Sequence, residues 1–545
     1  MNDKIQTSYD DLVEKGIYYA KKFELNSALN NFLKAVDLEK SRPEAYINLS
    51  NIYILSKNYK RAFKILQNYG FKYEISILDQ LWKLSINYNL EKNLFNYLFK
   101  LEKLDNSKYQ NRYFLFFLIG KLYVRSSNLS KAIDYFKKSI NLNTKNIQSY
   151  INMLDCLERL NKINDLKKYL DLFQENLNTN DSKVLFFQSL YFNRIKEFKK
   201  SEEIIINYKL EKKLINENYY YPRILNLKCK NNEKLENYSN SFELIEKRNN
   251  FLSNLKENKR IKRENYSQLV QKYKSVYTNK NLYLALEQSD KLKNDNINLA
   301  FLVGFPRSGT TLLDTILRTS SETIVLEEKP FLPNLWNKYF DNKNRNLNSI
   351  SNITSNEIID LRKYYFDQIN LSEQNKNKLI IDKIPLTLAE LAFVKIIFPE
   401  SKIILALRHP CDVVLSCFFT SFKMNEAMIN FLDWEDTINF YNNVFELFEF
   451  YEQQLQLNYI KIKYENVIYN FTQEVSKLFN FLNLKYKKNI ENFHKVAQNR
   501  KSISTPSYNQ VVNPLYSNSI GRWKKYKKYI NLESQLKKWI IKFNY

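Results

Sequence analysis

The spacing of large and small side chains repeats every 34 residues in the N-terminal part of the chain. In the first unit Gly16 and Ala28 are the small residues, with Tyr19 and Phe32 as the aromatic residues that follow them. The positions that continue this pattern are Tyr46, Ser50, Tyr53, Ala62, Leu66 and Tyr69, then Phe116, Gly120, Tyr123, Ala132, Phe136 and Ser139, and finally Tyr150, Leu154, Leu157, Leu166 and Leu170. Small residues let paired helices approach closely, and aromatic residues fill the groove between neighbouring pairs. The pattern predicts an α-solenoid of helical hairpins over residues 1–207, with degenerate units near 76–110 and 180–207, rather than an irregular helical bundle.

Downstream of this array the pattern of hydrophobic positions changes twice. Over residues 208–295 the repeat blurs and Asn and Lys become frequent, so we expect a helical linker or cap with a solvated basic face. After residue 298, short apolar runs alternate with amphipathic stretches. We expect strands at 299–303, 322–326, 378–383, 401–407 and 460–467, and helices at 310–319, 387–397, 411–421 and 471–484. Residues 296–545 should therefore form an α/β domain around a mainly parallel sheet, which makes the whole a multidomain α and α/β protein.

Composition excludes several classes of protein. Four Cys in 545 residues exclude a disulfide-stapled scaffold, and two His exclude a His-rich metal centre, so we expect no metal. The net charge of +26 predicts an anionic ligand, substrate or surface, but we expect no nucleic acid as partner. The longest apolar runs are too short to span a bilayer, and the first residues lack the apolar stretch of a secretory signal. We therefore expect no transmembrane segment and a cytoplasmic location.

A loop that could bind phosphate follows the first expected strand of the α/β domain. Gly304 and Gly309 have the spacing of the G-x-x-x-x-G-K-[ST] loop of nucleotide triphosphatases, and a helix begins directly afterwards. Thr310 stands where that loop has its Lys, and Arg307 partly replaces the lost cation. Such a loop suits a single 5′-phosphate that bears another leaving group better than a β/γ-phosphate pair with magnesium. A nucleotide kinase or triphosphatase, with Asp382 holding the metal, is the disfavoured alternative.

The segment Pro-Arg-Ser-Gly-Thr-Thr resembles the 5′-phosphosulfate loop of sulfotransferases that use 3′-phosphoadenosine 5′-phosphosulfate (PAPS), and the N-terminal units resemble tetratricopeptide repeats. The first resemblance covers roughly residues 297–545 and is strongest to the tyrosylprotein sulfotransferase family. It implies that the 5′-phosphate is held by Pro306, Arg307, Ser308, Gly309, Thr310 and Thr311.

The same resemblance implies the catalytic residues. Glu328 lies 21 positions after Arg307, where tyrosylprotein sulfotransferases have their catalytic base. A carboxylate there would take the proton of the acceptor hydroxyl as it attacks sulfur. An ordinary polar strand end is the alternative for this residue. Lys383 follows another expected strand and corresponds to the family's lysine that contacts the sulfate or the bridging oxygen.

Further elements of the resemblance imply the rest of the nucleotide site. Arg408, and Ser416 eight residues later, match the motif that binds the 3′-phosphate, although His409 stands where the family usually has Asp; we expect His409 to be structural. Tyr464 matches a tyrosine near the nucleotide, with a sheet-packing role as the alternative. The additional residues implied to contact the nucleotide lie in the C-terminal loop and are Ser507 and Arg522.

Together these elements predict an enzyme that transfers a sulfuryl group from PAPS to an acceptor hydroxyl and releases 3′-phosphoadenosine 5′-phosphate (PAP). We expect the acceptor hydroxyl to belong to a peptide (for example, to a tyrosine), to a glycan or to a small molecule. The concave face of the repeats would recruit the acceptor or a protein partner. The alternative is a non-catalytic tetratricopeptide interaction protein whose second domain only binds a nucleotide.

Overall fold

The computed structural model describes residues 8–70, 73–104, 111–292, 298–340, 345–372, 375, 377–498, 515 and 517–545. The chain divides into two compact units, Met1–Lys196 and Glu197–Tyr545.

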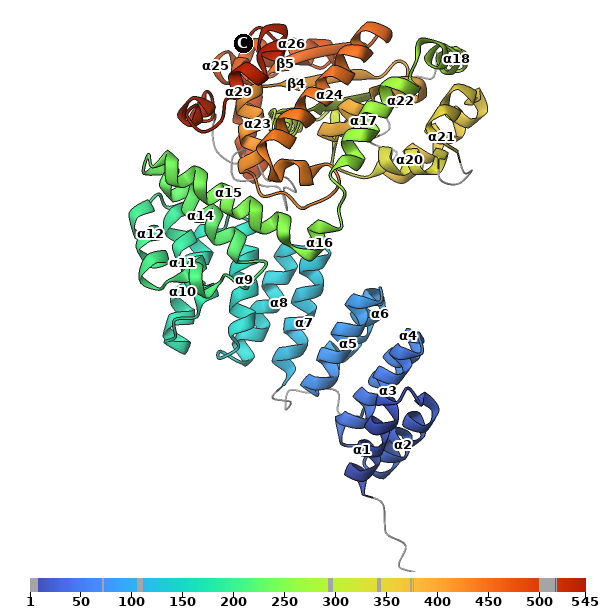
Figure 1. Ribbon diagram of the computed structural model, residues 1–545, viewed down its shortest axis with the longest axis vertical. Coiled ribbons are helices and arrows are strands. Elements are labelled where there is room, and N and C mark those ends of the chain that lie inside the picture. The colour runs from blue at the N-terminus through green and yellow to red at the C-terminus, as the bar shows by residue number, and fades with distance from the viewer. Residues whose placement is uncertain are drawn as a thin grey trace, which may run out of the picture. The chain divides into compact units, whose positions relative to one another are not determined.

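The first unit consists of helices arranged as successive hairpins (Figure 1). Their bounds are α1 Tyr9–Lys21, α2 Leu25–Leu38, α3 Pro43–Leu55, α4 Tyr59–Gln67, α5 Ile75–Asn87, α6 Glu91–Glu102, α7 Arg112–Arg125, α8 Leu129–Leu142, α9 Ile147–Arg159, α10 Ile163–Leu177 and α11 Ser182–Arg194. The predicted close packing is present. A Cβ on Gly16 would lie 2.4 Å from the ring of Phe32, and one on Gly120 would lie 2.6 Å from the ring of Phe136. The repeat array predicted from the 34-residue spacing is confirmed.

The turns inside these hairpins share one geometry. Lys57 and Asn161 have positive φ of 57° and 54°, and the amide of the next residue donates to a carbonyl five residues back, as Asn58 does to Tyr53. The same turn, with Glu236 at φ 61° and the Asn237 amide 2.8 Å from the Asn232 carbonyl, joins two helices of the second unit. These helices are α14 (Tyr221–Lys234) and α15 (Tyr238–Asn254). A repeat-type hairpin therefore lies within the region expected to be a linker or cap.

The second unit begins with helices and continues into the α/β domain. The helices before the sheet are α12 Phe198–Asn207, α13 Leu210–Lys213, α14, α15, α16 Lys256–Lys259, α17 Glu264–Val276 and α18 Asn279–Asp290. Their side chains contact the α/β domain at several points; for example, Arg263 pairs with Asp436 at 2.9 Å. The helices of 197–292 thus form one compact unit with the α/β domain, and the proposed boundaries at 207 and 295 stay predictions.

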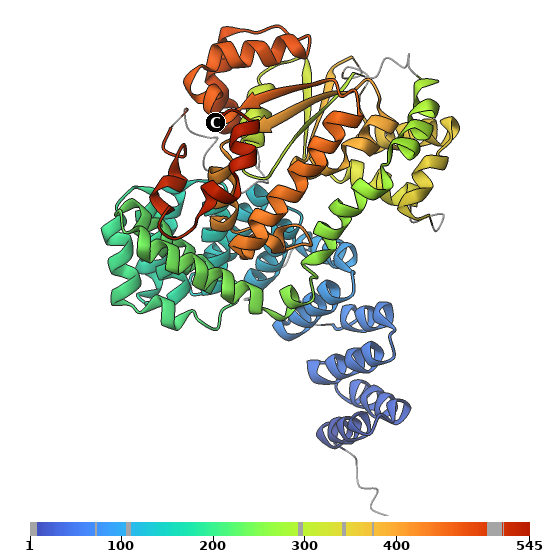
Figure 2. The same cartoon turned by 45° about the horizontal axis from the view of Figure 1, so that its top comes forward.

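A five-stranded parallel sheet forms the centre of this unit, as predicted. Its strands are β1 Leu299–Gly304, β2 Thr323–Glu327, β3 Leu379–Lys383, β4 Lys402–Leu407 and β5 Tyr459–Lys463, in the order β2-β3-β1-β4-β5. Helices cover both faces (Figures 1 and 2). On one face α19 (Thr310–Leu317) and α26 (Phe471–Phe481) pack on Leu302, Ile404 and Ile462. Because all five strands are parallel, their carboxyl ends meet at one edge, where such sheets build binding sites.

The remaining elements of the α/β domain connect and cover the strands. They are α20 Phe331–Phe340, η2 Leu347–Asn352, α21 Ser355–Ile369, η4 Pro385–Glu390, α22 Leu391–Ile397, α23 Pro410–Phe419, η5 Met428–Leu432, α24 Trp434–Gln454, α25 Tyr464–Tyr469, η6 Lys488–Asn492, α27 Phe493–Gln498, η7 Arg522–Tyr526, α29 Leu532–Gln535 and α30 Lys537–Lys542. One expected strand was too long. β5 ends at Lys463 and Tyr464 begins α25, so the alternation over 460–467 continues into a helix. Within the described ranges, every helix is too short or too polar to cross a bilayer.

Candidate active site

The loop between β1 and α19 has the backbone form of an anion-binding loop. Gly309 has φ 100°, a left-handed value that side chains disfavour, and it is the residue directly before α19. Arg307, inside the loop, also has positive φ, at 71°. Thr310 and Thr311 form the first turn of α19 and are buried. The first amides of a helix have no partner within the helix and carry its positive dipole end, so this loop can hold a phosphate.

Arg307, Arg408 and Ser416 come together at this loop although about a hundred positions separate Arg307 from the other two. Arg307 donates from Nε to the Ser416 hydroxyl at 3.1 Å, and Arg408 donates from Nη1 to the Arg307 carbonyl at 3.4 Å. The strand register explains the convergence, since Gly304 at the end of β1 lies beside Ala406 near the end of β4. The two predicted phosphate motifs therefore share one place at the edge of the sheet.

Tyr464 and the segment around Ser519 complete this cluster. The guanidinium of Arg408 lies 5.1 Å from the centre of the Tyr464 ring, and the Tyr464 hydroxyl is 2.8 Å from the Ser519 hydroxyl. Arg408 also donates from Nη2 to the Ser519 carbonyl. A Cβ on Gly309 would lie 3.0 Å from the Tyr464 ring, so this ring lies directly against the phosphate loop.

Two buried polar atoms of this cluster have no hydrogen-bond partner within the described ranges. They are the Ser308 hydroxyl and Nε of Arg408. A buried donor without a partner is costly, so an anionic ligand at this loop would stabilise either donor that it reaches. The cradle, the two arginines and these two donors fit a nucleotide with phosphates at two positions.

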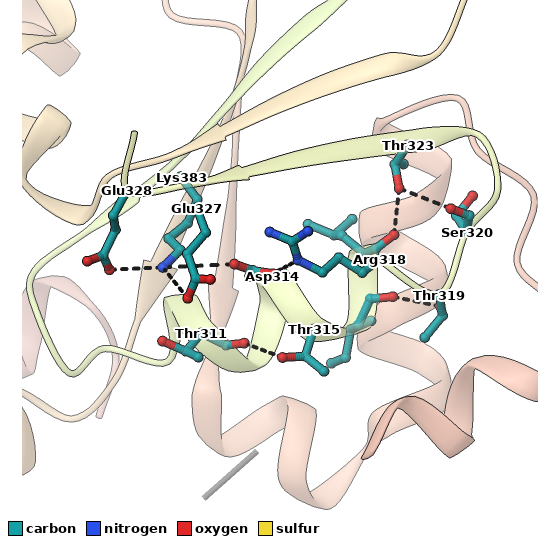
Figure 3. A network of polar contacts seen from close by, with 12 residues as sticks. Thr311, Asp314, Thr315, Arg318, Thr319, Ser320, Thr323, Glu327, Glu328 and Lys383 are labelled. Atoms are coloured by element: carbon teal, nitrogen blue, oxygen red, sulfur yellow. Dashed lines mark hydrogen bonds and ion pairs between the residues drawn. The ribbon is translucent and has the colours of Figure 1, made fainter. Parts of the chain in front are cut away.

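Lys383 and Glu328 form the second part of the site, beside the phosphate loop. Lys383 ends β3 and is fully buried; its Nζ donates to Oε1 of Glu328 at 2.9 Å. Nζ also lies 3.7 Å from Glu327 and 3.8 Å from Asp314 of α19 (Figure 3). Glu328 is the more accessible carboxylate, with 37% of its side chain exposed. One buried cation thus faces a half-exposed carboxylate, which is a suitable pair for moving a proton next to a developing negative charge.

Asp314 is a residue of this network that the sequence reasoning missed. It is fully buried and pairs with Arg318 as well as approaching Lys383. It follows Thr310 by one helical turn and therefore lies on the same side of α19. A charged residue at that spacing in an otherwise uncharged helix was the signal that could have found it.

Asp382 points away from Lys383, because successive side chains of a strand alternate between faces. It is buried, and its Oδ2 accepts from the Tyr365 hydroxyl at 2.7 Å. Burial raises the pKa of Asp382 from its ordinary value of 3.8 to about 7, against the opposing effects of the Tyr365 hydrogen bond and the Lys383 charge. Within the ranges that the structure describes, no three His, Cys, Asp or Glu side chains gather as a metal site would require.

His409 has a structural place, as expected. Its Nδ1 accepts from the Cys411 amide at 3.2 Å, which caps the start of α23, and its ring stacks on Trp523 at 5.3 Å between centres. Asp412 accepts from the amides of Gly521 and Trp523 at 2.6 and 3.0 Å. The C-terminal segment is therefore tied to the start of α23.

Two of the predicted nucleotide contacts are not placed in this cluster. Ser507 lies outside the described residues. Arg522 forms a two-pronged ion pair with Glu233 of α14, at 2.5 and 2.9 Å, and its guanidinium lies 4.6 Å from the Phe419 ring centre. The role of either residue in nucleotide binding stays a prediction.

Two parts of the chain match models of known protein families. Residues 300–488 match the Sulfotransferase family, and residues 115–146 match a tetratricopeptide repeat. The chain therefore carries a sulfotransferase-family domain together with tetratricopeptide repeats.

The chain is also similar to individual proteins. It is 22% identical over 306 residues to an uncharacterized protein of Aquifex aeolicus, covering 55% of this chain and 39% of that one. It is 22% identical over 249 residues to protein-tyrosine sulfotransferase A of Caenorhabditis elegans, covering 43% of this chain and 63% of that one. These matches span less than two thirds of either relative. Among solved structures, the sulfotransferase domain of the Synechococcus PCC 7002 olefin synthase aligns with a TM-score of 0.34 at 18% identity, covering 46% of this chain and 97% of that one.

Proposed function

We propose that the chain is a PAPS-dependent sulfotransferase that transfers a sulfuryl group to an acceptor hydroxyl. The observation that carries this proposal is the convergence of Arg307, Ser416 and Arg408 at one loop, with Arg307 3.1 Å from Ser416. Two cationic groups at one site suit a nucleotide that carries phosphate at both the 5′ and 3′ positions. The sulfotransferase-family match over 300–488 supports the same donor.

In this proposal each residue has a defined task. The amides and hydroxyls of residues 308–311 hold the 5′-phosphate with Arg307, and Arg408 and Ser416 hold the 3′-phosphate. Lys383 supplies positive charge where the bond between sulfur and the 5′-phosphate oxygen breaks. Bound PAPS supplies the activated sulfuryl group, and PAP is the product.

Glu328 is the base of the proposed reaction. Its Oε1 accepts from Lys383 at 2.9 Å, so we assign Oε2 to the acceptor proton. The acceptor oxygen forms the new bond to sulfur, its proton passes to Glu328, and PAP leaves with the electrons of the broken bond. The likeness to a protein-tyrosine sulfotransferase supports a tyrosine peptide as acceptor, with the repeats recruiting it.

Calorimetric titration with PAP and with ADP, with and without magnesium, tests the nucleotide. We expect PAP to bind without magnesium and more tightly than ADP. Binding of ADP that requires magnesium would instead indicate a kinase or triphosphatase.

The substitution Glu328→Gln tests the base. PAP release from PAPS is followed with a tyrosine peptide, an N-acetylglucosamine oligosaccharide and p-nitrophenol as three classes of acceptor. We expect kcat to fall by about 10²–10⁴ while the Kd for PAP stays within about twofold. The matched control is Glu322→Gln, an exposed carboxylate just before β2, which should leave both unchanged. Normal turnover in E328Q would remove Glu328 from the role of base, whereas PAP binding without turnover in the wild type would favour the non-catalytic alternative.

A further inference from the structure

The repeat-type hairpin α14–α15 contacts the C-terminal end of α23, the helix that carries Ser416 in its last turn. Arg248 of α15 is fully buried and donates to the last two carbonyls of α23. Nη2 lies 2.9 Å from the Phe418 carbonyl and Nη1 lies 2.9 Å from the Phe419 carbonyl. A side chain of the helical region thus caps the C-terminus of a helix in the α/β domain.

The four final carbonyls of α23 can be accounted for completely. Those of Ser416 and Cys417 accept from the hydroxyl and the amide of Thr420, at 2.6 and 3.1 Å. Those of Phe418 and Phe419 accept from Arg248, and Phe418 also accepts from Asn249 at 3.2 Å. The end of a helix leaves four such carbonyls without partners, and α15 satisfies two of them. A positive charge at this end also matches the helix dipole.

No carboxylate pairs with Arg248 within the described ranges; its further partners are neutral oxygens of Asn226, Asn249 and Ser421. Burial lowers the pKa of Arg248 to about 10. A buried charge is costly unless its surroundings compensate for it, and here the helix end does so. The cost is tolerable only while α15 and α23 keep their relative position, so the contact is geometrically demanding.

The same hairpin also contacts a second segment, which is hydrogen-bonded to Arg408. Glu233 of α14 pairs with Arg522, and the Ser241 hydroxyl lies 3.0 Å from the Tyr526 hydroxyl. This segment begins at Ser519, whose carbonyl accepts from Arg408. The hairpin therefore contacts two elements that flank the cluster of Arg307, Arg408 and Ser416.

We propose that Arg248 is a positioning residue of the nucleotide site, through which the hairpin α14–α15 sets the place of α23 and so the convergence of Ser416 with Arg307. The identity of the ligand rests on the proposed function. Counted from the hairpin turn, Arg248 takes the position that Ala35 has in the first repeat, since each lies eleven residues after the turn amide. One repeat unit has thus become part of the site.

The test compares two buried arginines that each end a helix. Arg248→Met removes the contact to α23. The control Arg362→Met removes a hydrogen bond of 2.6 Å from Arg362 Nε to the carbonyl of Ile397, the last residue of α22. Both variants should lower the melting temperature of the full chain. Only R248M should raise the Kd for PAP and the KM for PAPS, by about 10- to 100-fold, if its loss acts as the loss of a residue that supports a metal ligand does. At saturating PAPS its kcat should return to within a few-fold of the wild-type value.

Arg248→Lys is the conservative variant, and it also replaces R248M in the test if R248M does not fold. It keeps the charge at the helix end with fewer donors, so its Kd should lie between those of the wild type and R248M. If R248M does not fold, R248K compared with R362M decides the question. Wild-type affinity in every Arg248 variant that folds, or an equal loss in R362M, overturns the inference and leaves the proposed function intact. Failure of the wild-type chain to bind PAP overturns both.

Discussion

Replacing Gly304 with Ala should damage the phosphate loop through a backbone contact. A Cβ at this position would lie 2.6 Å from the Ala406 carbonyl oxygen and 2.7 Å from the Ser308 hydroxyl. Carbon and oxygen atoms in close contact lie about 3.3 Å apart, so the overlap with Ala406 is about 0.7 Å. Ala406 is the partner of Gly304 in the neighbouring strand, and its carbonyl cannot rotate away.

The size of the effect follows from this overlap. Overpacking a buried site costs about 1–3 kcal/mol, and the strain is relieved by moving the end of β1 away from β4. That movement displaces the loop that begins at Gly304, and a displacement approaching 1 Å in a positioned site can cost about 10²-fold. We expect G304A to lose about 1–3 kcal/mol of unfolding free energy and to bind PAP at least about tenfold more weakly.

Urea denaturation and calorimetric titration with PAP measure the two effects. Gly70→Ala is the matched control, because a Cβ there would meet no atom of the described residues within 4 Å, and it should change neither quantity. If G304A lost stability but bound PAP normally, the loop would not be the binding element. If G304A changed neither quantity, the reasoning from the strand spacing would be wrong.

Three further predictions follow from the structure. Gly120→Ala should lose about 1–2 kcal/mol of unfolding free energy, because the clash of a Cβ 2.6 Å from Phe136 outweighs the better helix propensity of Ala. Adding Phe136→Leu to G120A should restore most of this loss. If denaturation of the wild type, the two single variants and the double variant showed simply additive effects, the prediction would be contradicted. Burial raises the pKa of both Asp382 and Glu390 to about 7, so each keeps in the folded state a proton that the unfolded chain releases above about pH 4. The wild type should therefore lose stability as pH rises from 4 to 7 and then level off, and Asp382→Asn should show a smaller loss because the contribution of Glu390 remains. Parallel curves of unfolding free energy against pH for the two proteins would refute this reasoning. Arg522→Gln and Glu233→Gln should each cost about 1–3 kcal/mol of unfolding free energy. If Arg522 contacts the nucleotide, only R522Q should also weaken PAP binding in the titration. Equal Kd values for the two variants would assign Arg522 to the ion pair alone.

Features that depend on short stretches of chain could be predicted from the sequence. The 34-residue spacing anticipated the contact of Gly120 with Phe136, because the approach of two paired helices depends on residue size within one hairpin. The positions of Lys383 and Arg408 at strand ends, and of Arg307 in the loop after a strand, were equally predictable. In a parallel sheet the carboxyl ends must meet at one edge, so a motif at each end is brought to a common place by the topology alone.

The contacts that join distant segments were decided only by the tertiary structure. The Ser519 carbonyl on Arg408 and Arg248 at the end of α23 leave no trace in local periodicity. Each forms because packed elements of the fold bring together groups far apart in the chain, where buried donors and acceptors must find partners. Local periodicity specifies which face of an element is apolar, but the partner of a buried charge is chosen by whichever element packs against it.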